Sequence, residues 1–351
     1  MKTMQEEVID LLKQLIAIPS ISGEEQGTAQ AISQFLQSKG VVARRHKNNV
    51  WAVNKYYDKA KPTILLNSHH DTVKPNHAYT KDPFHPIVED GKLYGLGSND
   101  AGGALVSLLA TFLHFYERAD MKYNLLYAAS AEEEISGYNG VESLLQEIGP
   151  IHAAIVGEPT QMQMATSEKG LLVIDCTVNG TSAHAAHNMG VNAIYEAMKD
   201  IEWFSQYKYP VESDLLGPVK MSVTIINAGT QHNMIPARCN FTVDIRTNEH
   251  YTHQQVLDII CQHVSCEVKP RSVRLRSTSI AEDHPLVQAG THLGLNCFGS
   301  PTLSDKALMP FPALKMGPGD TQRSHIADEF IYVDEIHSGI DIYTQLLNQL
   351  L

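Results

Sequence analysis

Histidine and acidic residues that could bind a metal ion or transfer a proton occur in five short motifs of this sequence. They are His69 and Asp71, Asp100, Glu133 and Glu134, Glu158, and His325. Taken singly, each is more often structural than functional, because 17 histidines and 39 acidic residues in 351 positions produce such neighbours by chance. The chemical argument therefore depends on the set as a whole.

The set combines two histidines with several carboxylates and contains no cysteine. Zinc and cobalt take imidazole and carboxylate ligands at catalytic sites, whereas structural zinc sites typically use thiolates. Five ligands are more than one tetrahedral catalytic zinc uses, and they predict two metal ions that share one carboxylate. A further glutamate beside such a pair can act as a general base, because a cation makes neighbouring carboxylates tolerable in a dry cleft.

Three apolar runs, 63–66, 124–129 and 153–156, lead directly into three of these motifs. They alternate with helical patterns such as 104–115, which predicts an α/β domain with a mainly parallel sheet. Ligands of such sheets bind beyond the carboxyl ends of the strands, so we expect the motifs to meet at one edge. Near the N-terminus, Ser22 followed by Glu25 predicts a capping box at the start of a helix.

The pattern changes near residue 171. Alternating apolar residues predict strands at 171–178, 219–226, 240–247 and 268–275, and amphipathic patterns predict helices at 190–207 and 250–264. This order, β-α-β-β-α-β, is the ferredoxin-like split βαβ arrangement. We therefore expect an inserted α+β domain, 171–278, within a discontinuous catalytic domain formed by 1–170 and 279–351.

Composition excludes several classes of function. The 27 basic and 39 acidic residues give a net charge of −12, which argues against a nucleic-acid partner. No apolar run approaches the roughly 18 residues of a membrane span, and Glu6, Glu7 and Asp10 interrupt the place of a signal peptide. Five cysteines without a CxxC pair predict free thiols. We expect a cytoplasmic protein that has no membrane partner.

The motifs together resemble the co-catalytic zinc amidohydrolases, the family that includes acetylornithine deacetylase, succinyl-diaminopimelate desuccinylase, aminoacylase and glutamate carboxypeptidase. The resemblance runs over nearly the whole chain, in the family's order. Its motifs are 15–20 (LIAIPS), 68–73 (SHHDTV), 95–103 (GLGSNDAGG), 132–134 (EEE), 157–160 (GEPT), 180–184 (GTSAH), 233–236 (NMIP), 244–246 (DIR), 304–305 (SD) and 317–325 (GPGDTQRSH). It implies a zinc-peptidase-like catalytic domain.

The resemblance also assigns roles to residues. His69, Asp100 and Glu158 resemble the ligands of one zinc, and Asp100, Glu134 and His325 those of a second, with Asp100 as the bridge; cobalt is an alternative metal. Asp71 would orient His69, and Glu133 would be the general base. This chain has Asp-Ala-Gly-Gly at 100–103 and Glu-Glu-Glu at 132–134, where the family usually has Asp-Met-Lys-Gly and Asp-Glu-Glu.

The inserted domain resembles the family's lid and dimerisation domain, which implies a homodimer. His184 matches a histidine that reaches the partner's active site, and Asn233 and Arg246 match positions that grip a substrate carboxylate. From the residues alone, a surface ion pair with Asp244 is the simpler interpretation of Arg246.

The implied reaction is hydrolysis of the amide bond of an N-acyl amino acid. The segment 65–75 and the short chain resemble the acetylornithine deacetylases of arginine biosynthesis most. N-acetylcitrulline, N-succinyl-ornithine or N-succinyl-citrulline, succinyl-diaminopimelate and dipeptides or carboxypeptidase substrates stay open. A non-catalytic homologue would lack a ligand or the base, and a single-metal storage site would lack the base; neither absence is found in the sequence.

Overall fold

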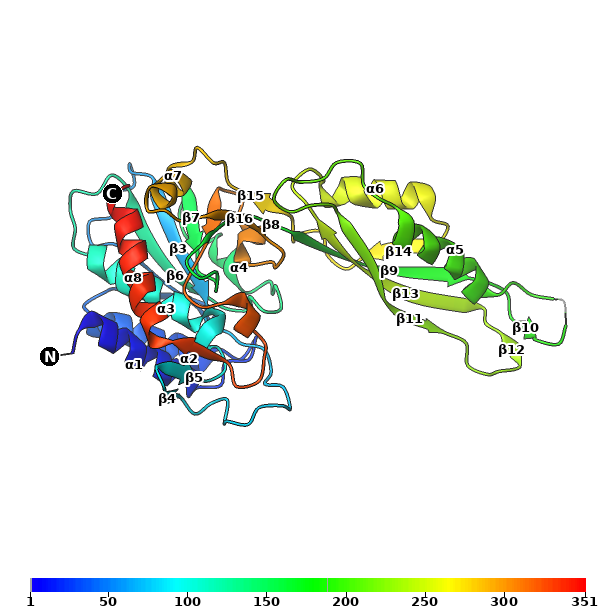
Figure 1. The fold of residues 1–351 in the computed structure, drawn as a ribbon, viewed down its shortest axis with the longest axis horizontal. Helices are drawn as coiled ribbons and strands as arrows, with labels where there is room; N and C mark the ends of the chain where they lie inside the picture. Colours follow the sequence, from blue (N-terminus) through cyan, green and yellow to red (C-terminus); the bar gives the residue numbers. More distant parts are fainter. Residues whose placement is uncertain (1, 188) are drawn as a thin grey trace. The chain divides into compact units, whose positions relative to one another are not determined.

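The computed structural model describes residues 2–187 and 189–351, and the chain divides into two compact units (Figure 1). Unit 1 comprises the chain up to Thr166 together with Ile280–Phe298 and Ser304–Leu351, and unit 2 comprises Ser167–Ser279 and Gly299–Leu303. Within the described residues, none of the helices has both the length and the apolar character needed to cross a membrane.

The centre of unit 1 is a mixed sheet that is mainly parallel in the middle. Its order is β1 (Arg44–His46), β2 (Asn49–Val53), β6 (Asn124–Ser130), β3 (Thr63–His69), β7 (Ala153–Val156), β17 (Ala313–Lys315), β8 (Met164–Glu168) and β15 (Thr278–Ser279), and β16 (Cys297–Ser300) also pairs with β8. The β6–β3, β3–β7 and β7–β17 pairs are parallel, and the outer pairs are antiparallel. The predicted α/β class with a mainly parallel sheet is confirmed.

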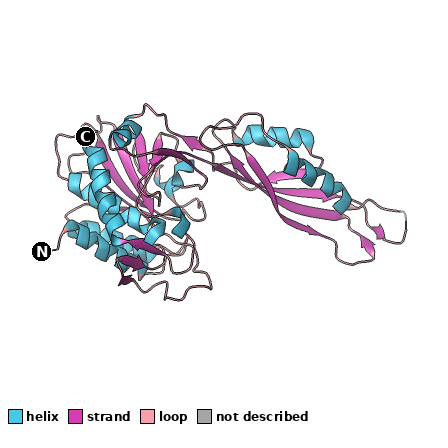
Figure 2. Ribbon diagram, in the orientation of Figure 1, coloured by secondary structure: helices cyan, strands magenta, loops and turns pink. Residues whose placement is uncertain are grey.

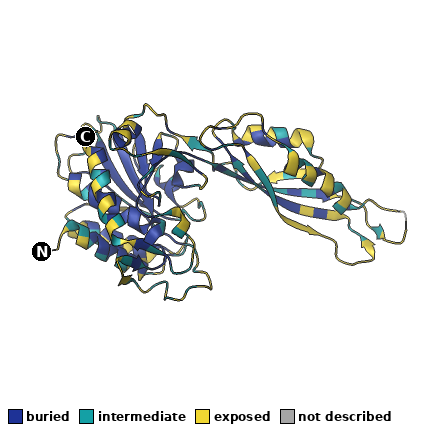
Figure 3. Cartoon of the chain, in the orientation of Figure 1, coloured by how far each residue is buried: buried dark blue, intermediate teal, exposed yellow. Residues whose placement is uncertain are grey.

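Both faces of this sheet are covered, and its inner strands β3 and β6 are buried along their whole length (Figures 2 and 3). Ile64 and Leu66 belong to one core, and Leu65 between them belongs to a core on the other face. The larger core is formed with α1 (Met4–Ile16), α2 (Gln26–Ser38), α3 (Gly103–Phe115), α7 (Pro285–His292) and α8 (Val333–Asn348). The smaller core includes residues of α4 (Val141–Leu144). Leu308, at the end of the 3₁₀ turn η2 (Asp305–Leu308), packs against this core.

The capping box expected at Ser22 and Glu25 is wrong. Helix α2 begins at Gln26, and its N-cap residue, Glu25, makes no side-chain capping bond. Both side chains have other partners: Ser22 Oγ donates to Asp71 Oδ2 at 2.7 Å, and the Glu25 carboxylate accepts the N–H of Glu132 at 3.2 Å. Tertiary contacts with the loops of the candidate site thus override the local pattern.

Unit 1 also contains a small antiparallel sheet with the strand order β18 (Phe330–Tyr332), β5 (Lys92–Tyr94) and β4 (Ile87–Glu89). Strand β5 precedes the glycine-rich segment that carries Asp100, and β18 follows the loop that carries His325. The pairing of Phe330 with Tyr94 therefore brings these two distant segments of the chain together.

Unit 2 is built on a four-stranded antiparallel sheet. Along the chain it contains β9 (Gly170–Asn179), α5 (Ala193–Gln206), β11 (Lys220–Ala228), β13 (Arg238–Thr247), α6 (His253–His263) and β14 (Glu267–Pro270), with the sheet order β11-β13-β9-β14. The chain order is β-α-β-β-α-β, as in split βαβ folds. The strand predicted at 268–275 ends earlier, at Pro270, although the N–H of Arg271 still donates to the main-chain oxygen of Val173 at 2.9 Å.

Candidate active site

Three parallel strands end where the candidate residues lie. His69 is the last residue of β3, Glu133 and Glu134 follow β6, and Glu158 follows β7. Since β3 lies between β6 and β7 and runs parallel to both, the three ends meet at one edge of the sheet. This is the edge at which ligands of such sheets bind.

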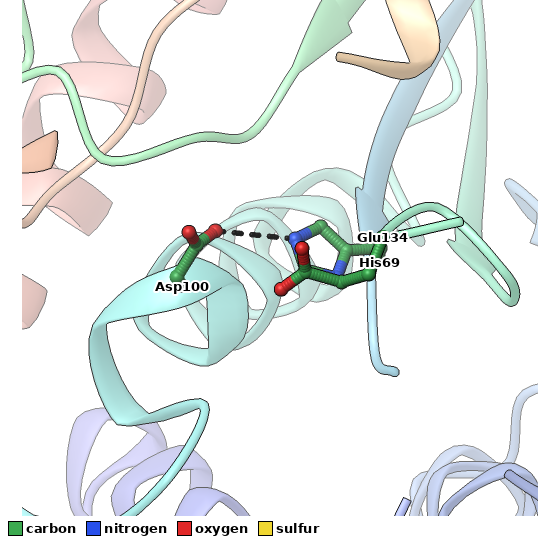
Figure 4. Close-up of side chains that lie close together, drawn as sticks. All are labelled: His69, Asp100 and Glu134. Atoms are coloured by element: carbon green, nitrogen blue, oxygen red, sulfur yellow. Dashed lines mark hydrogen bonds and ion pairs between the residues drawn. The ribbon is translucent and has the colours of Figure 1, made fainter. Parts of the chain in front are cut away.

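Asp100 is supplied by an irregular element rather than by a strand. It lies in a π-helical turn, η1 (Ser98–Gly102), that leads into α3. Gly97, just before this turn, has a φ of +76°, a conformation that favours glycine. Figure 4 shows the carboxylate of Asp100 facing the imidazole of His69, with the carboxylate of Glu134 beside that ring.

His69 is buried, and its two ring nitrogens have different surroundings. Nδ1 lies 3.0 Å from the main-chain oxygen of Asp71 and 3.4 Å from its Oδ1, so it carries the proton and donates it. Nε2 lies 3.3 Å from Asp100 Oδ1, 3.9 Å from Glu133 Oε2 and 4.0 Å from Glu158 Oε1. This second nitrogen, Nε2, thus faces three carboxylates.

His325 closes the other side of Asp100. It follows a 3₁₀ turn, η3 (Thr321–Arg323), and its Nε2 lies 3.0 Å from Glu134 Oε2 and 3.7 Å from Asp100 Oδ2. The carboxylate of Asp100 therefore lies between the two imidazoles, as a bridging ligand would. Hydrogen bonding to Glu134 raises the pKa of His325 to about 9.

The carboxylates gathered here repel one another. Burial raises the pKa of Glu133 well above its ordinary value, and burial together with the charge of Asp100 raises the pKa of Glu158 to about 8. For His69, burial favours the neutral ring, but the charge of Glu133 and the hydrogen bond to Asp100 outweigh it and raise the pKa. The buried carboxylates crowd negative charge into the site, and a bound cation would relieve it.

The donor atoms fit a metal centre. The ligand atoms of His69, Asp100 and Glu134 all lie within 4.8 Å of one another, and so do those of His69, Glu133 and Glu158. Imidazole and carboxylate are the ligands that zinc and cobalt accept. Glu133, which the sequence assigns as the base, thus belongs to one of the two groups, and His325 adjoins the other.

Buried carboxylates hold the loops that carry these ligands. Asp71 Oδ1 accepts the N–H of Glu133 and Asp71 Oδ2 that of Glu134, each at 3.1 Å. Asp71 also contacts His69, so one side chain fixes both the ring and the glutamate loop. Such outer-sphere carboxylates orient metal ligands and set the tautomer of the histidine.

The remaining candidates lie in unit 2. His184 is in a short hairpin, β10 (Ala183–His184) with β12 (Met234–Ile235); it is exposed, and its Nδ1 accepts the N–H of Ala186. Asn233 immediately precedes β12, and its main-chain oxygen accepts the N–H of Ala185. Arg246 forms a two-pronged ion pair with Asp244, at 2.8 and 3.1 Å.

Sequence reasoning assigned no role to three buried side chains of this region, although two of them, His70 and Asp305, lie in motifs named above. Glu329 accepts the N–H groups of the Asp100 segment. Asp305 accepts hydrogen bonds from Asn67 and Ser130, and burial raises its pKa to about 6. His70 is packed against Thr28, and burial lowers its pKa to about 4. A buried acid next to a ligand motif was the available signal, but only the fold shows what it faces.

Comparison with known proteins identifies a family. The family model for peptidase family M20/M25/M40 matches residues 65–349. The chain is 28% identical over 374 residues to an acetylornithine deacetylase of Proteus mirabilis, covering 97% of this chain and 95% of the relative. It is 23% identical over 376 residues to a succinyl-diaminopimelate desuccinylase of Ruegeria, covering 97% and 94%.

Solved structures share the fold at lower identity. An M20 family metallo-carboxypeptidase of Sulfolobus solfataricus has a TM-score of 0.78 at 17% identity, covering 98% of this chain and 99% of its own. A dinuclear metal-binding M20 peptidase of Bacillus subtilis has a TM-score of 0.74 at 17% identity, covering 98% and 97%. Since the family model spans most of the sequence, this chain belongs to peptidase family M20/M25/M40.

Proposed function

We propose that this amidohydrolase of the M20 family uses two metal ions to cleave N-acyl amino acids, and that N-acetylornithine is its substrate. The observation that carries the proposal is the carboxylate of Asp100, which lies between His69 and His325. Each imidazole has a further carboxylate near it, Glu158 at 4.0 Å from His69 and Glu134 at 3.0 Å from His325. This arrangement suits a carboxylate-bridged metal pair better than a single ion.

In this proposal, His69, Asp100 and Glu158 hold one ion, and Asp100, Glu134 and His325 hold the other. When bound, such a pair lowers the pKa of water and polarises an amide carbonyl. Zinc is the metal we propose, and cobalt is the alternative that accepts the same ligands.

Glu133 supplies the proton transfers. Its carboxylate accepts a proton from the attacking water and delivers it to the leaving amine nitrogen, so a carboxylic acid and a free amino acid are released. Asp71 supports this step because it holds the backbone N–H of Glu133 and the ring of His69 at once.

We further propose that the chain is a homodimer formed through unit 2, in which His184 stabilises the oxyanion in the partner's site. Asn233 and Arg246 are proposed to bind the substrate carboxylate. A guanidinium that forks onto a carboxylate is suited to this task, and Arg246 already binds Asp244 in that way. A substrate carboxylate would therefore have to compete with Asp244.

The test is a substrate panel with the metal-loaded full chain. It contains the acetyl and succinyl forms of ornithine and citrulline, N-succinyl-diaminopimelate and a dipeptide, and the released primary amine is measured. We expect the highest kcat/KM for N-acetylornithine, and the Glu133→Gln protein serves as the background control. A higher value for a succinyl compound or the dipeptide would move the substrate to that class.

A further inference from the structure

Glu329 is enclosed by the backbone of the segment that carries Asp100. Its Oε1 accepts the N–H of Asn99 at 2.8 Å and that of Asp100 at 2.9 Å, and its Oε2 accepts the N–H of Gly97 at 3.1 Å. Its main-chain oxygen accepts the N–H of Gly95 at 3.0 Å. Glu329 is 1% exposed, so these contacts replace hydration of the carboxylate.

The three contacts require a group that only accepts hydrogen bonds. Both oxygens of a carboxylate accept hydrogen bonds, whereas the amide of glutamine would point its NH₂ at one of the N–H groups. The site is therefore matched to a glutamate and not merely to a side chain of that size.

These contacts bear directly on Asp100. Glu329 fixes the backbone N–H of Asp100, and the carboxylate of Asp100 lies 3.3 Å from His69 Nε2 and 3.7 Å from His325 Nε2. The same segment is joined to the turn before His325, because Asn99 exchanges two hydrogen bonds with the backbone of Asp320, each at 3.0 Å. Displacement of this segment would move the shared ligand relative to both histidines.

We infer that Glu329 is a positioning residue of the metal centre, whose carboxylate accepts three backbone N–H groups and so holds Asp100 where it can bind two metal ions at once. This inference rests on the proposed function, because it assumes that the site binds metal. It predicts that replacing the Glu329 carboxylate weakens metal binding even where the fold survives.

A purely structural role is the competing explanation, and unit 2 offers a matched control. Asp200 is also a buried carboxylate, 5% exposed, that accepts two backbone N–H groups, those of Ser265 and Cys266, each at 2.9 Å. Unit 2 contributes none of the grouped ligand atoms. Asp200→Asn therefore makes the same chemical change away from the ligands.

The experiment titrates the metal-free full chain with Zn²⁺ by calorimetry and with Co²⁺ by visible absorption, alongside thermal unfolding of the metal-free proteins. Changes to groups behind metal ligands typically cost about 10–100-fold in metal affinity. We expect Glu329→Gln to lower the affinity for the second metal ion taken up in the titration by this factor, and to change the absorption spectrum of bound Co²⁺. Asp200→Asn should stay within about twofold of the wild type, and Glu329→Asp, which keeps a carboxylate, should fall between them.

Wild-type affinity in Glu329→Gln, with only a lower unfolding temperature, would overturn the inference. If Glu329→Gln does not fold, Glu329→Asp decides: weaker binding than in Asp200→Asn supports the inference, and equal binding overturns it. A wild-type chain that takes up neither Zn²⁺ nor Co²⁺ would overturn the proposed function and this inference with it.

Discussion

Glu133 and Glu134 are adjacent and both donate their backbone N–H to Asp71, yet their carboxylates face different partners. Glu134 lies 3.0 Å from His325, whereas Glu133 lies 3.9 Å from His69. Both are held by the same acceptor, so a difference between their variants would come from the carboxylates themselves.

We predict that Glu133→Gln keeps two metal ions per chain but lowers kcat by about 10²–10⁴-fold, because it removes the proton acceptor and no ligand. Glu134→Gln should instead bind less metal, because it removes a donor. Elemental analysis after gel filtration, together with kcat, separates the two. The opposite pattern would show that the roles of the two glutamates are exchanged.

At the scale of elements, the turn η1 depends on close packing that only glycine permits. A Cβ on Gly102 would lie 2.4 Å from the main-chain oxygen of Gly97 and 2.5 Å from Leu12 Cδ1. The oxygen cannot retreat easily, because it accepts the N–H of Gly102 at 2.9 Å. The conformation of this turn therefore sets where Asp100 lies.

We expect Gly102→Ala to destabilise unit 1 by about 1–3 kcal/mol, the usual cost of forcing an extra group into a packed interior. Urea unfolding of the metal-free chain, followed by Trp51 fluorescence in a Trp203→Phe background, measures this. Gly149→Ala is the control, because its Cβ would meet only Tyr57 Oη at 3.6 Å. Equal stability of the two variants would contradict the packing argument.

Helix α6 offers a pH-dependent prediction in unit 2. His253, the first residue of α6, is buried. Its Nδ1 donates a hydrogen bond to the main-chain oxygen of Val273 at 3.1 Å, and burial lowers the pKa of the ring. Below the ordinary histidine pKa of about 6.5, the unfolded chain takes up a proton that the folded chain resists. Stability from the neutral ring is therefore present above this pH and is lost as the pH falls toward the lowered folded pKa.

We predict that His253→Gln weakens the fall in unfolding free energy between pH 7 and pH 5, by up to about 1.4 kcal/mol per pH unit for one proton. Urea midpoints from Trp203 fluorescence, in a Trp51→Phe background, report on unit 2. The Trp51→Phe chain with His253 intact is the reference. An unchanged slope in His253→Gln would refute the prediction.

Elements with a strong period were predictable from the sequence, and elements shaped by distant contacts were not. The strand 63–66 corresponds to the first part of β3, and the helix 190–207 surrounds α5. The role of Glu329 was not predictable, because its partners lie more than two hundred positions earlier in the chain. Ser22 failed as a cap for the same reason: its hydroxyl binds Asp71.

At the scale of the whole molecule, the proposed metal ligands and the hydrophobic cores are separate sets of residues. The cores on the two faces of the central sheet consist of apolar side chains and include none of the ligand residues. We therefore predict that chelation with EDTA abolishes activity but leaves most of the far-UV circular dichroism unchanged. Zn²⁺ or Co²⁺ should restore the activity, and a large loss of helical signal on chelation would contradict this independence.

The proposed dimer makes a prediction of its own. If His184 acts in the partner's site, a two-fold contact makes both sites composite. His184→Ala should lose about 10²–10³-fold in rate, the usual cost of an oxyanion donor. Mixing it with Glu133→Gln chains should regenerate one working site per heterodimer. A mixture that stays inactive, although mass spectrometry shows subunit exchange, would exclude action across the dimer.

The place of β17 in the sheet has a consequence for how the protein is made. This strand lies between β7 and β8, although it is formed by Ala313–Lys315, near the end of the chain. All strands of the unit 2 sheet are synthesised by Pro270, so this sheet can form on the ribosome while β7 still has an unpaired edge. Unpaired edges invite pairing with other chains. Nascent chains that stall after Pro270 and before Ala313 would therefore be the form of this protein most prone to aggregate.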